Sequence, residues 1–330
     1  MKKFSDYLSE QYPKQIEEQT PAEEGMNATN IVHPSFVMCP PFNLHVFDQN
    51  NFFAKKYAKD GEVDRNKAMN QFLGVYSFVS TWALTYLIPH DYSLQDQSFV
   101  ANLGIVLPHW KDGNTVVVSE FRSRPRVGEQ KPGIDLFNSL QLDVDVAPKF
   151  FEGEADLKYF NGNNYVGAYG IRTSIEALNW FEKKYDMNIV KVENHDEKMY
   201  HLDCMIYPLY SNVALCYTKL FSKENLRAIE KFADIVDIPE SVGREGGITN
   251  CVGLNRMLMC GSSINDLKVT DEDYDYERKK IDFLTKVCAN HSLEPFFFNI
   301  SEYRKSGADL SCMFMHLNYT RHSEEYVHGA

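Results

Sequence analysis

The chain has 330 residues, 44% of them hydrophobic, so it is long enough to bury a substantial core in one large domain or two average ones. Its formal net charge of -12 at pH 7 argues against a nucleic-acid partner or an anionic membrane surface, because phosphate binding depends on clustered Lys and Arg. An acidic chain suits a cationic small molecule instead.

Seven cysteines are scattered along the chain without any C-x-x-C pair: Cys39, Cys204, Cys216, Cys251, Cys260, Cys288 and Cys312. This pattern predicts neither a zinc site nor a disulfide framework, and a reducing compartment fits it best. The start MKKFSDYLSEQYPK has no continuous apolar core, so we expect a cytoplasmic protein without a secretory signal. No Gly-rich phosphate loop and no H-E-x-x-H motif are present, so we expect neither a cofactor nor a metal.

Residues 1–30 are polar and acidic, which predicts a loosely attached N-terminal tail, and residues 31–330 are expected to form a single domain. No charged residue occurs between Phe72 and Ile88, a run long enough to resemble a membrane span. Its Ser, Thr and Tyr residues instead predict a buried helix followed by a buried strand.

A helix, a strand and a hairpin recur along the chain. Helical stretches begin near Asn66, Gly133, Ser174, Ser222 and Tyr274. Each is followed by a strand candidate (TYLIP, LDVDV, NIVKV, DIVDI or PFFFNI) and then by a hairpin, and Thr173 with Glu176 has the spacing of a capping box. A repeat of roughly 50 residues suggests radial repetition. We therefore predict an α/β fold, a pseudo-fivefold five-bladed propeller of ββαβ units, although two stacked α/β layers would produce a similar pattern.

One polar or nucleophilic residue stands near the opening of the hairpin in each predicted unit. These residues are Asn102, Glu152, His201, Asn250 and Cys312. If the units surround an axis, equivalent positions converge on it. We therefore predict that a carboxylate, an imidazole and a thiol meet in one central pocket.

Cys312 lies in KSGADLSCM, where Gly307 lets the backbone bend before the apolar strand MFMHL. A cysteine is a nucleophile only as a thiolate, which a nearby histidine or a cationic substrate favours. The alternative is a buried structural cysteine, the commonest fate of a free thiol. The register of Cys312 with His201 and Glu152 favours the nucleophile.

His201 and Asp203 alternate on the predicted strand MYHLDCMIYPL, so their side chains should share one face. The functional interpretation makes His201 a general acid and base and Asp203 a ligand for a cation. The alternative is a half-exposed strand whose polar face meets water.

Glu152 and Asp156 lie in the turn FEGEAD, where Glu152 could pair bidentately with a planar cation and Asp156 is grouped with the substrate-binding residues. Acidic turns are also common on surfaces. Arg126 in RPRVGE and Arg172 in YGIRT have the fork geometry that matches a substrate carboxylate, although each alone is more often a surface arginine.

The motifs MCPP, DQSFVANLG, FEGEAD, YGIRT, HLD and a late G-x-x-x-x-C together resemble the guanidino-group-modifying superfamily. This group includes arginine deiminases, dimethylarginine dimethylaminohydrolases, amidinotransferases and arginine dihydrolases. The resemblance runs from about Val37 to Leu317 and looks strongest to the cyanobacterial-type arginine dihydrolases, which form ornithine, carbon dioxide and ammonia. It implies a pentein-type catalytic domain.

The resemblance also implies roles for individual residues. Cys312 matches the family's nucleophile, His201 its acid and base, and Glu152 and Asp203 its guanidinium-binding carboxylates. The implied reaction is attack of the thiolate on a guanidinium carbon, followed by hydrolysis of a covalent thiouronium.

Four further residues match substrate-binding positions. Asn51 and Asn102 match active-site asparagines of the dihydrolases, and Arg126 and Arg172 match their arginines for the substrate carboxylate. The sequence departs from the dihydrolase pattern at Phe52-Phe53, where the family has Pro-Trp, and at Ala155, which replaces a glycine of the acidic motif.

The expected partner is therefore a small molecule, arginine or a related guanidino compound, with no nucleic acid and no membrane, and a homo-oligomer is left open. Arginine dihydrolase is the first expectation. The alternatives are an amidinotransferase, an arginine deiminase, a dimethylarginine dimethylaminohydrolase and a noncatalytic protein that binds guanidino ligands.

Overall fold

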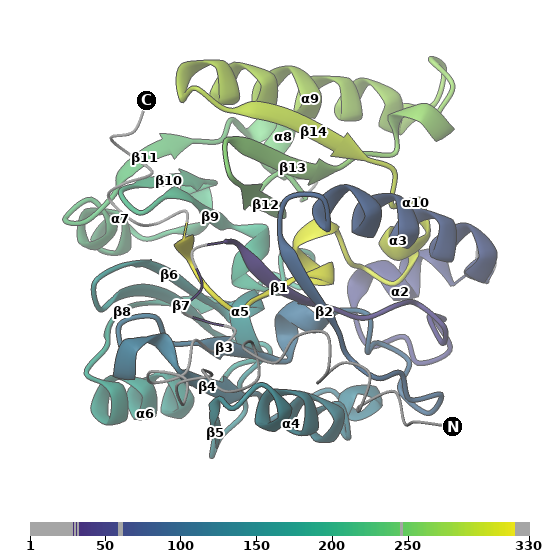
Figure 1. Ribbon diagram of the computed structural model, residues 1–330. Coiled ribbons are helices and arrows are strands. Elements are labelled where there is room, and N and C mark those ends of the chain that lie inside the picture. Colours follow the sequence, from purple (N-terminus) through teal and green to yellow (C-terminus); the bar gives the residue numbers. More distant parts are fainter. Residues whose placement is uncertain (1–28, 30, 32, 59–61, 245–246, 321–330) are drawn as a thin grey trace, which may run out of the picture.

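The computed structural model describes residues 29, 31, 33–58, 62–244 and 247–320. Its described part contains five sheets of three strands each, joined by helices (Figure 1). The predicted tail lies outside the described residues except for Thr29. The assignment of residues 31–330 to one domain stays a prediction.

All five sheets have the same construction: two antiparallel strands, then a helix, then a third strand parallel to the second. In four of them the two antiparallel strands form a hairpin. The first sheet in the chain is β3 (Gly104–Val106), β4 (Thr115–Val118) and β5 (Asp143–Val146), with α4 (Gln130–Ser139). The second is β6 (Leu157–Asn161), β7 (Asn164–Gly170) and β8 (Asn188–Asn194), with α6 (Ile175–Tyr185). The third is β9 (Ile206–Tyr210), β10 (Val213–Cys216) and β11 (Asp234–Asp237), with α7 (Lys223–Ile229). The fourth is β12 (Cys251–Leu254), β13 (Met257–Gly261) and β14 (Glu294–Phe298), with α9 (Glu272–Asn290).

The fifth sheet joins the two ends of the described chain. It consists of β15 (Met315–His316), β1 (Ser35–Met38) and β2 (Leu84–Leu87), with α3 (Arg65–Val79). Val37 pairs with Met315 on its antiparallel side and with Tyr86 on its parallel side. The predicted ββαβ unit is therefore present five times among the described residues, once assembled from both ends of the sequence.

Shorter segments connect these units. They are α2 (Phe52–Tyr57), η1 (Val100–Asn102), η2 (Lys111–Gly113), η3 (Arg124–Arg126), α5 (Gly153–Asp156), η4 (Leu202–Cys204), η5 (Thr218–Leu220), α8 (Glu240–Gly243), η6 (Ile264–Asp266), α10 (Ser301–Lys305) and η7 (Leu310–Met313). Four of them, η1, α5, η4 and η7, come directly before the first strand of a sheet. Three-stranded sheets this small bury their faces only against their neighbours: Ile105 of β3 packs in one hydrophobic cluster with Leu157 of β6.

The uncharged run from Phe72 to Ile88 divides into a helix and a strand, as predicted. The side chains of Phe72, Val75 and Val79 form the buried face of α3 at helical spacing. The prediction of a buried strand was wrong, because β2 is the outer strand of its sheet and Leu84 at its start is 46% exposed. Among the described residues, no helix combines the length and the apolar composition needed to cross a membrane.

The predicted capping box at the start of α6 also differs from the structure. Ser174, not Thr173, caps the helix, and its side chain accepts a hydrogen bond from the backbone N–H of Ala177. The Thr173 hydroxyl is used elsewhere, because it donates to Asp156 Oδ2 at 2.7 Å. This bond ties α6 to the turn that carries Glu152.

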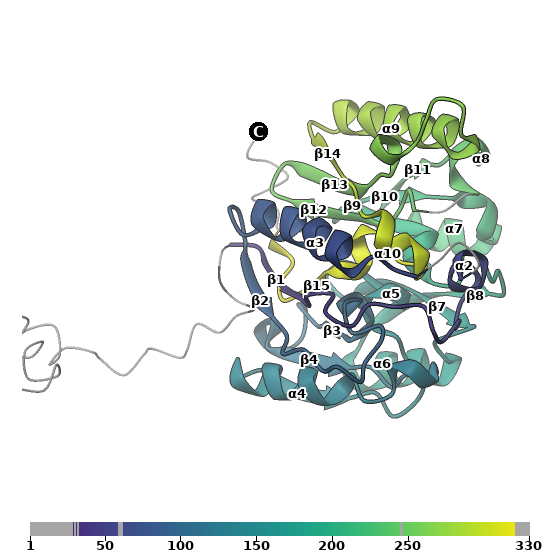
Figure 2. The same cartoon turned by 90° about the vertical axis from the view of Figure 1, so that its right-hand side faces the viewer.

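The turns before the first strands lie against one another. α5 contacts η1 and η4, and η1 contacts η7. The approach is so close that a Cβ on Gly153 would lie 2.4 Å from the carbonyl oxygen of Ala101, and Gly153 also has φ +58°. Only glycine fits this backbone position without strain. In the two views of Figures 1 and 2, the long helices α3, α4, α6 and α9 lie at the periphery, around these inner turns.

Candidate active site

The five residues predicted to converge lie on the inner turns and form two contact groups. In the first, Asn102 Nδ2 and His201 Nε2 both contact Glu152 Oε2, at 3.3 and 2.9 Å. In the second, Cys312 Sγ lies 3.5 Å from Asn250 Oδ1. Each residue comes from a different sheet unit, so the shared position in the repeat, and not sequence proximity, brings them together.

Cys312 lies on the one-turn helix η7, which Asp309 begins. Asp309 Oδ1 accepts a hydrogen bond from the N–H of Leu310 at 2.8 Å, and its carbonyl accepts one from the N–H of Cys312 at 3.2 Å. The sulfur lies 3.9 Å from Asp203 Oδ2. Burial and the Asp203 carboxylate raise the pKa of the Cys312 thiol well above its ordinary value. Burial and Asp203 therefore favour the protonated thiol at neutral pH.

His201 and Asp203 are presented by a 3-10 turn and not by a strand. The predicted strand begins only at Ile206, and His201 precedes η4 with an extended backbone, φ -124° and ψ 160°. The turn is fixed because the Asp203 carbonyl accepts hydrogen bonds from Thr249 Oγ1 at 2.7 Å and Asn250 Nδ2 at 3.0 Å. The strand assignment was therefore wrong, although both side chains reach the same cavity.

Glu152 is fully buried and ionised. Arg172 Nη1 lies 3.2 and 3.1 Å from its two carboxylate oxygens, and His201 Nε2 lies 2.9 Å from Oε2. Burial opposes ionisation of Glu152, but Arg172 and His201 outweigh it and hold the pKa of this carboxyl well below its ordinary value. The guanidinium that Glu152 binds in the structure is thus that of Arg172.

The contacts of Glu152 also fix how His201 is used. A neutral imidazole has one donor and one acceptor nitrogen, and Nε2 must donate to reach a carboxylate. Nε2 then has no lone pair for the amide of Asn102, which lies 3.3 Å away and donates to Glu152 instead. His201 Nδ1 is the nitrogen left for proton exchange.

Asp156 was predicted to bind substrate, but its carboxylate oxygens are hydrogen-bonded within the chain and it does not line the cavity that contains His201 and Cys312. Its Oδ2 accepts from the Thr173 hydroxyl and its Oδ1 accepts from the N–H of Leu202 at 3.2 Å. Burial is the main cause that raises its pKa to about 6, with Glu152 adding to the effect and His201 opposing it. Asp156 therefore links α6, α5 and η4 behind the site.

Arg126 and Arg172 both have partners within the chain. Arg126 donates to both carboxylate oxygens of Glu129, with the shortest distance 2.7 Å, and to the carbonyl of Phe99 at 2.8 Å. Arg172, besides its contacts with Glu152, donates to the carbonyl of Asn50 at 3.1 Å and lies over the ring of Tyr200. These arginines are 3% and 8% exposed, respectively.

Asn51 connects α2 to the segment that carries the nucleophile. Its Oδ1 accepts a hydrogen bond from the N–H of Ala54 and caps α2, while its Nδ2 donates to the carbonyl of Ser306 at 2.9 Å. Gly307 packs so closely on this side chain that a Cβ there would lie 2.5 Å from Asn51 Oδ1. The position of α2 is therefore coupled to that of η7.

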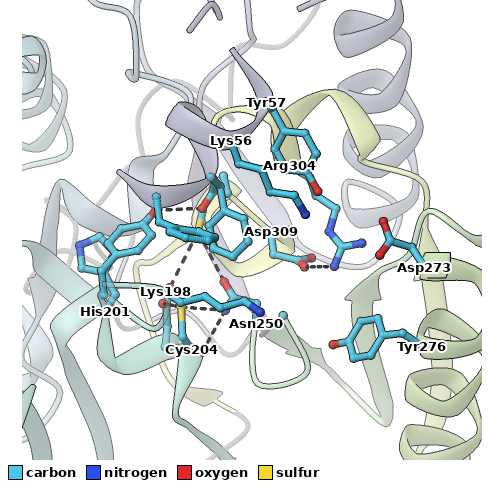
Figure 3. A pocket seen from close by; sticks show the side chains of 18 of the residues that line it. Lys56, Tyr57, Lys198, His201, Cys204, Asn250, Asp273, Tyr276, Arg304 and Asp309 are labelled. Carbon is cyan, nitrogen blue, oxygen red and sulfur yellow. Dashed lines mark hydrogen bonds and ion pairs between the residues drawn. The ribbon is translucent and has the colours of Figure 1, made fainter. Parts of the chain in front are cut away.

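Two adjacent cavities meet at the reacting groups. The larger has a volume of about 170 Å³, and its inner end is lined by His201, Asp203 and Cys312. It extends outward between α2, α9 and α10, as Figure 3 shows. The smaller cavity, about 20 Å³, shares His201 and Cys312 with the first and is lined further by the two asparagines and two arginines that were predicted to bind substrate: Asn51, Asn102, Arg126 and Arg172.

Sequence reasoning missed several residues of the site. The Ser311 hydroxyl donates to Asn250 Oδ1 at 2.8 Å and lies 3.3 Å from Asp203 Oδ2, so it links the two residues beside the sulfur. Tyr200 and Cys204 line the cavity next to His201 and Asp203. All three are sequence neighbours of predicted residues, and that adjacency was the available signal. Among the described residues, no three His, Cys, Asp or Glu side chains are arranged to hold a metal ion.

No family model matches the chain. A protein of Nostoc sp., the bifunctional arginine dihydrolase/ornithine cyclodeaminase AgrE, is 29% identical over 199 residues, which are 59% of this chain and 27% of that protein. The matched part is thus about a quarter of that relative's length.

Solved structures share the fold. The N-terminal domain of ArgZ bound to product, an arginine dihydrolase from cyanobacteria, superposes with a TM-score of 0.71 at 22% identity, covering 86% of this chain and 97% of that one. A dimethylarginine dimethylaminohydrolase adduct superposes with a TM-score of 0.64 at 18% identity, covering 86% and 99%. The chain is thus similar in sequence to a bifunctional arginine dihydrolase/ornithine cyclodeaminase, and it shares its fold with a cyanobacterial arginine dihydrolase and with a dimethylarginine dimethylaminohydrolase.

Proposed function

We propose that the protein hydrolyses the guanidinium group of arginine through a covalent thiouronium on Cys312, and that it is an arginine dihydrolase that forms ornithine, carbon dioxide and ammonia. The observation that carries the proposal is the convergence of Cys312, Asp203 and His201 at the inner end of one cavity. We interpret the five sheets as blades of a closed ring whose axis passes through this point.

Asp203 is the group that would hold the substrate cation. Its carboxylate lies within 3.9 Å of the sulfur, so a guanidinium paired with it presents its carbon to Cys312 at close range. Burial is the larger cause that raises the pKa of the thiol, and the Asp203 carboxylate is the second. The positive charge of the substrate removes the second cause, because it neutralises Asp203 next to the sulfur. Substrate binding thereby favours the thiolate.

The first half of the reaction releases ammonia. His201 Nδ1 takes the proton of the Cys312 thiol, and the thiolate attacks the guanidinium carbon to form a tetrahedral adduct. His201 then gives this proton to the departing nitrogen, which leaves as ammonia. The remaining thiouronium still carries the rest of the arginine. His201 then takes a proton from water, the resulting hydroxide attacks the same carbon, the C–S bond breaks and citrulline is formed.

The second half distinguishes a dihydrolase from a deiminase. The thiolate attacks the ureido carbon of citrulline, ornithine leaves with a proton from His201, and a carbamoyl group stays on Cys312. Water releases it as carbamate, which decomposes to carbon dioxide and ammonia. Asn102 supports this step, because an amide hydrogen-bonds a neutral urea without requiring a charge. The substrate-binding roles of Asn51, Arg126 and Arg172 stay predictions.

Product analysis tests the proposal. The purified protein is incubated with arginine, and ornithine, citrulline and ammonia are quantified by mass spectrometry and an ammonia assay, with and without added glycine or lysine. A dihydrolase forms one ornithine and two ammonia molecules for each arginine. A new guanidino compound in the presence of the amine would identify an amidinotransferase, accumulation of citrulline alone a deiminase, and absence of turnover would contradict the proposal.

A further inference from the structure

A chain of four charged side chains leads from α9 to the segment that carries the nucleophile, and the proposed reaction does not use it. Lys280 Nζ lies 3.1 Å from Glu277 Oε1, and both side chains are fully buried on α9. The same Oε1 lies 2.5 Å from Arg304 Nη1 of α10, and Arg304 Nη2 lies 3.6 Å from Asp309 Oδ2. Figure 3 shows the contact between Arg304 and Asp309. This charge chain therefore ends at the residue that begins η7.

Asp309 fixes the one-turn helix on which Cys312 lies. Its Oδ1 accepts the N–H of Leu310, and its backbone carbonyl accepts the N–H of Cys312. The carboxylate packs tightly against the end of β13, because a Cβ on Gly261 would overlap Asp309 Oδ1. Lys280 donates to the carbonyl of the same glycine at 2.9 Å. Displacement of Asp309 would therefore displace the nucleophile.

The same residue brings a carboxylate close to the nucleophile. Asp309 and Cys312 line one cavity. Burial and Asp203 are the main causes that raise the pKa of the Cys312 thiol, and the charge of Asp309 raises it further. Burial also raises the pKa of Asp309 itself, while Arg304 and Lys280 oppose that rise and favour its ionised form. A negative charge that holds the thiol in place thus makes it less reactive at neutral pH, unless cations offset that charge.

The charges of the four side chains cancel. Lys280 and Arg304 are the two cations. Burial opposes ionisation of Glu277, but Lys280 and Arg304 outweigh it and lower the pKa of this carboxyl to about 2. Asp309 is the second carboxylate. Buried ion pairs contribute little net stability, because the cost of removing charges from water offsets much of their attraction. Stability alone therefore gives little reason for a neutral set of charges at the start of η7.

From this geometry we propose that Arg304 and the buried pair of α9 are positioning residues that act on Cys312 through Asp309. They hold Asp309 at the start of η7 and cancel its charge beside the thiol. The inference rests on the proposed function only for the role of Cys312 as the nucleophile. It applies to any guanidino substrate, because none of these contacts involves the substrate.

Other groups that face the thiol are independent of this charge chain. Besides burial, Asp203 of η4 raises the pKa of the Cys312 thiol, whereas a backbone hydrogen bond from Asp309 and the charge of Lys158 on β6 lower it. Three further ionisable side chains line the same cavity: Tyr200, His201 and Cys204. Variants that change only the charge chain leave all of these groups in place.

Two variants of opposite charge test the inference. Alkylation of Cys312 by the neutral reagent chloroacetamide is followed between pH 6 and 9 by mass spectrometry of the peptide that contains it. Arg304→Met leaves one excess negative charge, so the rate at pH 7 should fall roughly two- to fivefold and the pH profile should move to higher pH. Asp309→Asn keeps an oxygen to cap Leu310 and leaves one excess positive charge, so the rate should rise and the profile should move to lower pH. The double variant is neutral again and should react within about twofold of the unmodified protein.

Lys305→Met is the matched control. Lys305 is also a cation of α10, but it pairs with Glu302 and does not line the cavity, so its removal should leave the alkylation rate unchanged. Thermal denaturation of each variant shows whether it is folded, and Asp309→Asn decides alone if Arg304→Met does not fold. Slower alkylation in both single variants, or an unchanged rate in Asp309→Asn, would overturn the inference. Opposite effects in a protein that does not turn over arginine would contradict the proposed function and leave the inference standing.

Discussion

Arg172 and Glu152 form a buried ion pair in which one guanidinium nitrogen lies within 3.2 Å of both carboxylate oxygens, and the same carboxylate holds His201 Nε2. The pair connects the region of the predicted substrate arginines to the acid and base of the site. Its consequence is that Arg172 orients His201 through Glu152, whatever else it binds.

Removal of Arg172 should therefore be costly for the fold. Arg172→Met leaves Glu152 buried without its main counter-charge, and loss of one partner of such a pair lowers the free energy of unfolding by about 3–5 kcal/mol. Urea denaturation monitored by tryptophan fluorescence measures this. Arg122→Met is the control, because Arg122 is an exposed arginine that donates to backbone carbonyls and should cost well below that amount. Equal losses in the two variants would show that the ion pair contributes nothing special.

The state of the Cys312 thiol can be tested with two reagents of the same shape. Chloroacetamide is neutral, whereas chloroacetamidine is a cation that pairs with Asp203. Because burial and Asp203 raise the thiol pKa, the neutral reagent should react slowly at pH 7 and faster as the pH rises, while the cationic one should react at least about tenfold faster at pH 7.

The Asp203→Asn variant reverses this preference. Removal of the carboxylate lowers the Cys312 pKa, so chloroacetamide should react faster than with the unmodified protein and chloroacetamidine more slowly. Rates are followed by mass spectrometry of the intact protein, with Cys312→Ser to subtract the other thiols. If the Asp203→Asn variant still reacted faster with chloroacetamidine than with chloroacetamide, Asp203 would not be the group that binds the guanidinium.

Asp156 gives a pH dependence of stability whose sign is fixed by its pKa. The folded-state pKa of about 6 is above the ordinary 3.8, so the folded state favours the protonated acid. The associated stability is fully present below about pH 4 and is lost as the pH rises through about 6, a change of about 3 kcal/mol for a shift of this size. Asp156→Asn cannot ionise, so the gap between variant and unmodified protein should change across this window. Urea denaturation at pH 4, 5, 6 and 7 measures the gap, and a constant gap would contradict the assignment.

Asn102 should control how far the reaction proceeds. The Asn102 amide lies 3.3 Å from Glu152, so Asn102→Asp places a second carboxylate beside the first. The added negative charge favours a bound cation over a neutral urea. The ratio of ornithine to citrulline should therefore fall. Asn102→Ala removes the amide without adding charge and separates the two effects. An unchanged ratio in Asn102→Asp would count against the role of Asn102 in retaining citrulline.

The repeat predicted that Glu152 and His201 come together and that His201 and Cys312 line one cavity, because one position in each unit faces the same inner region. The repeat did not predict the 3-10 turn that presents His201 and Asp203. The short apolar sequence after HLD is equally compatible with a strand that starts before His201. The motif FEGEAD predicted that Glu152 binds a guanidinium. The repeat could not show whether that guanidinium belongs to the substrate or to the chain, and in the structure it is the side chain of Arg172.

The outer part of the site was not predictable from the repeat at all. Lys56 of α2, Asp273 of α9 and Arg304 of α10 line the larger cavity. Of these helices, α2 and α10 are extra and not parts of the repeated unit. Tertiary packing brings these helices to one cavity, and the hydrogen bond from Asn51 to the Ser306 carbonyl joins the start of α2 to the end of α10. Because α2 and α10 do not recur in the other units, the repeat could not predict where they lie.

The most direct test of the account is to trap the covalent intermediate. The protein is mixed with isotopically labelled arginine, quenched in acid within a single turnover, and the peptide containing Cys312 is identified by mass spectrometry. The account predicts a labelled adduct on Cys312 with the mass of arginine minus ammonia, followed by a carbamoyl adduct. Turnover with an unmodified Cys312, or with the label on Cys204, would contradict it.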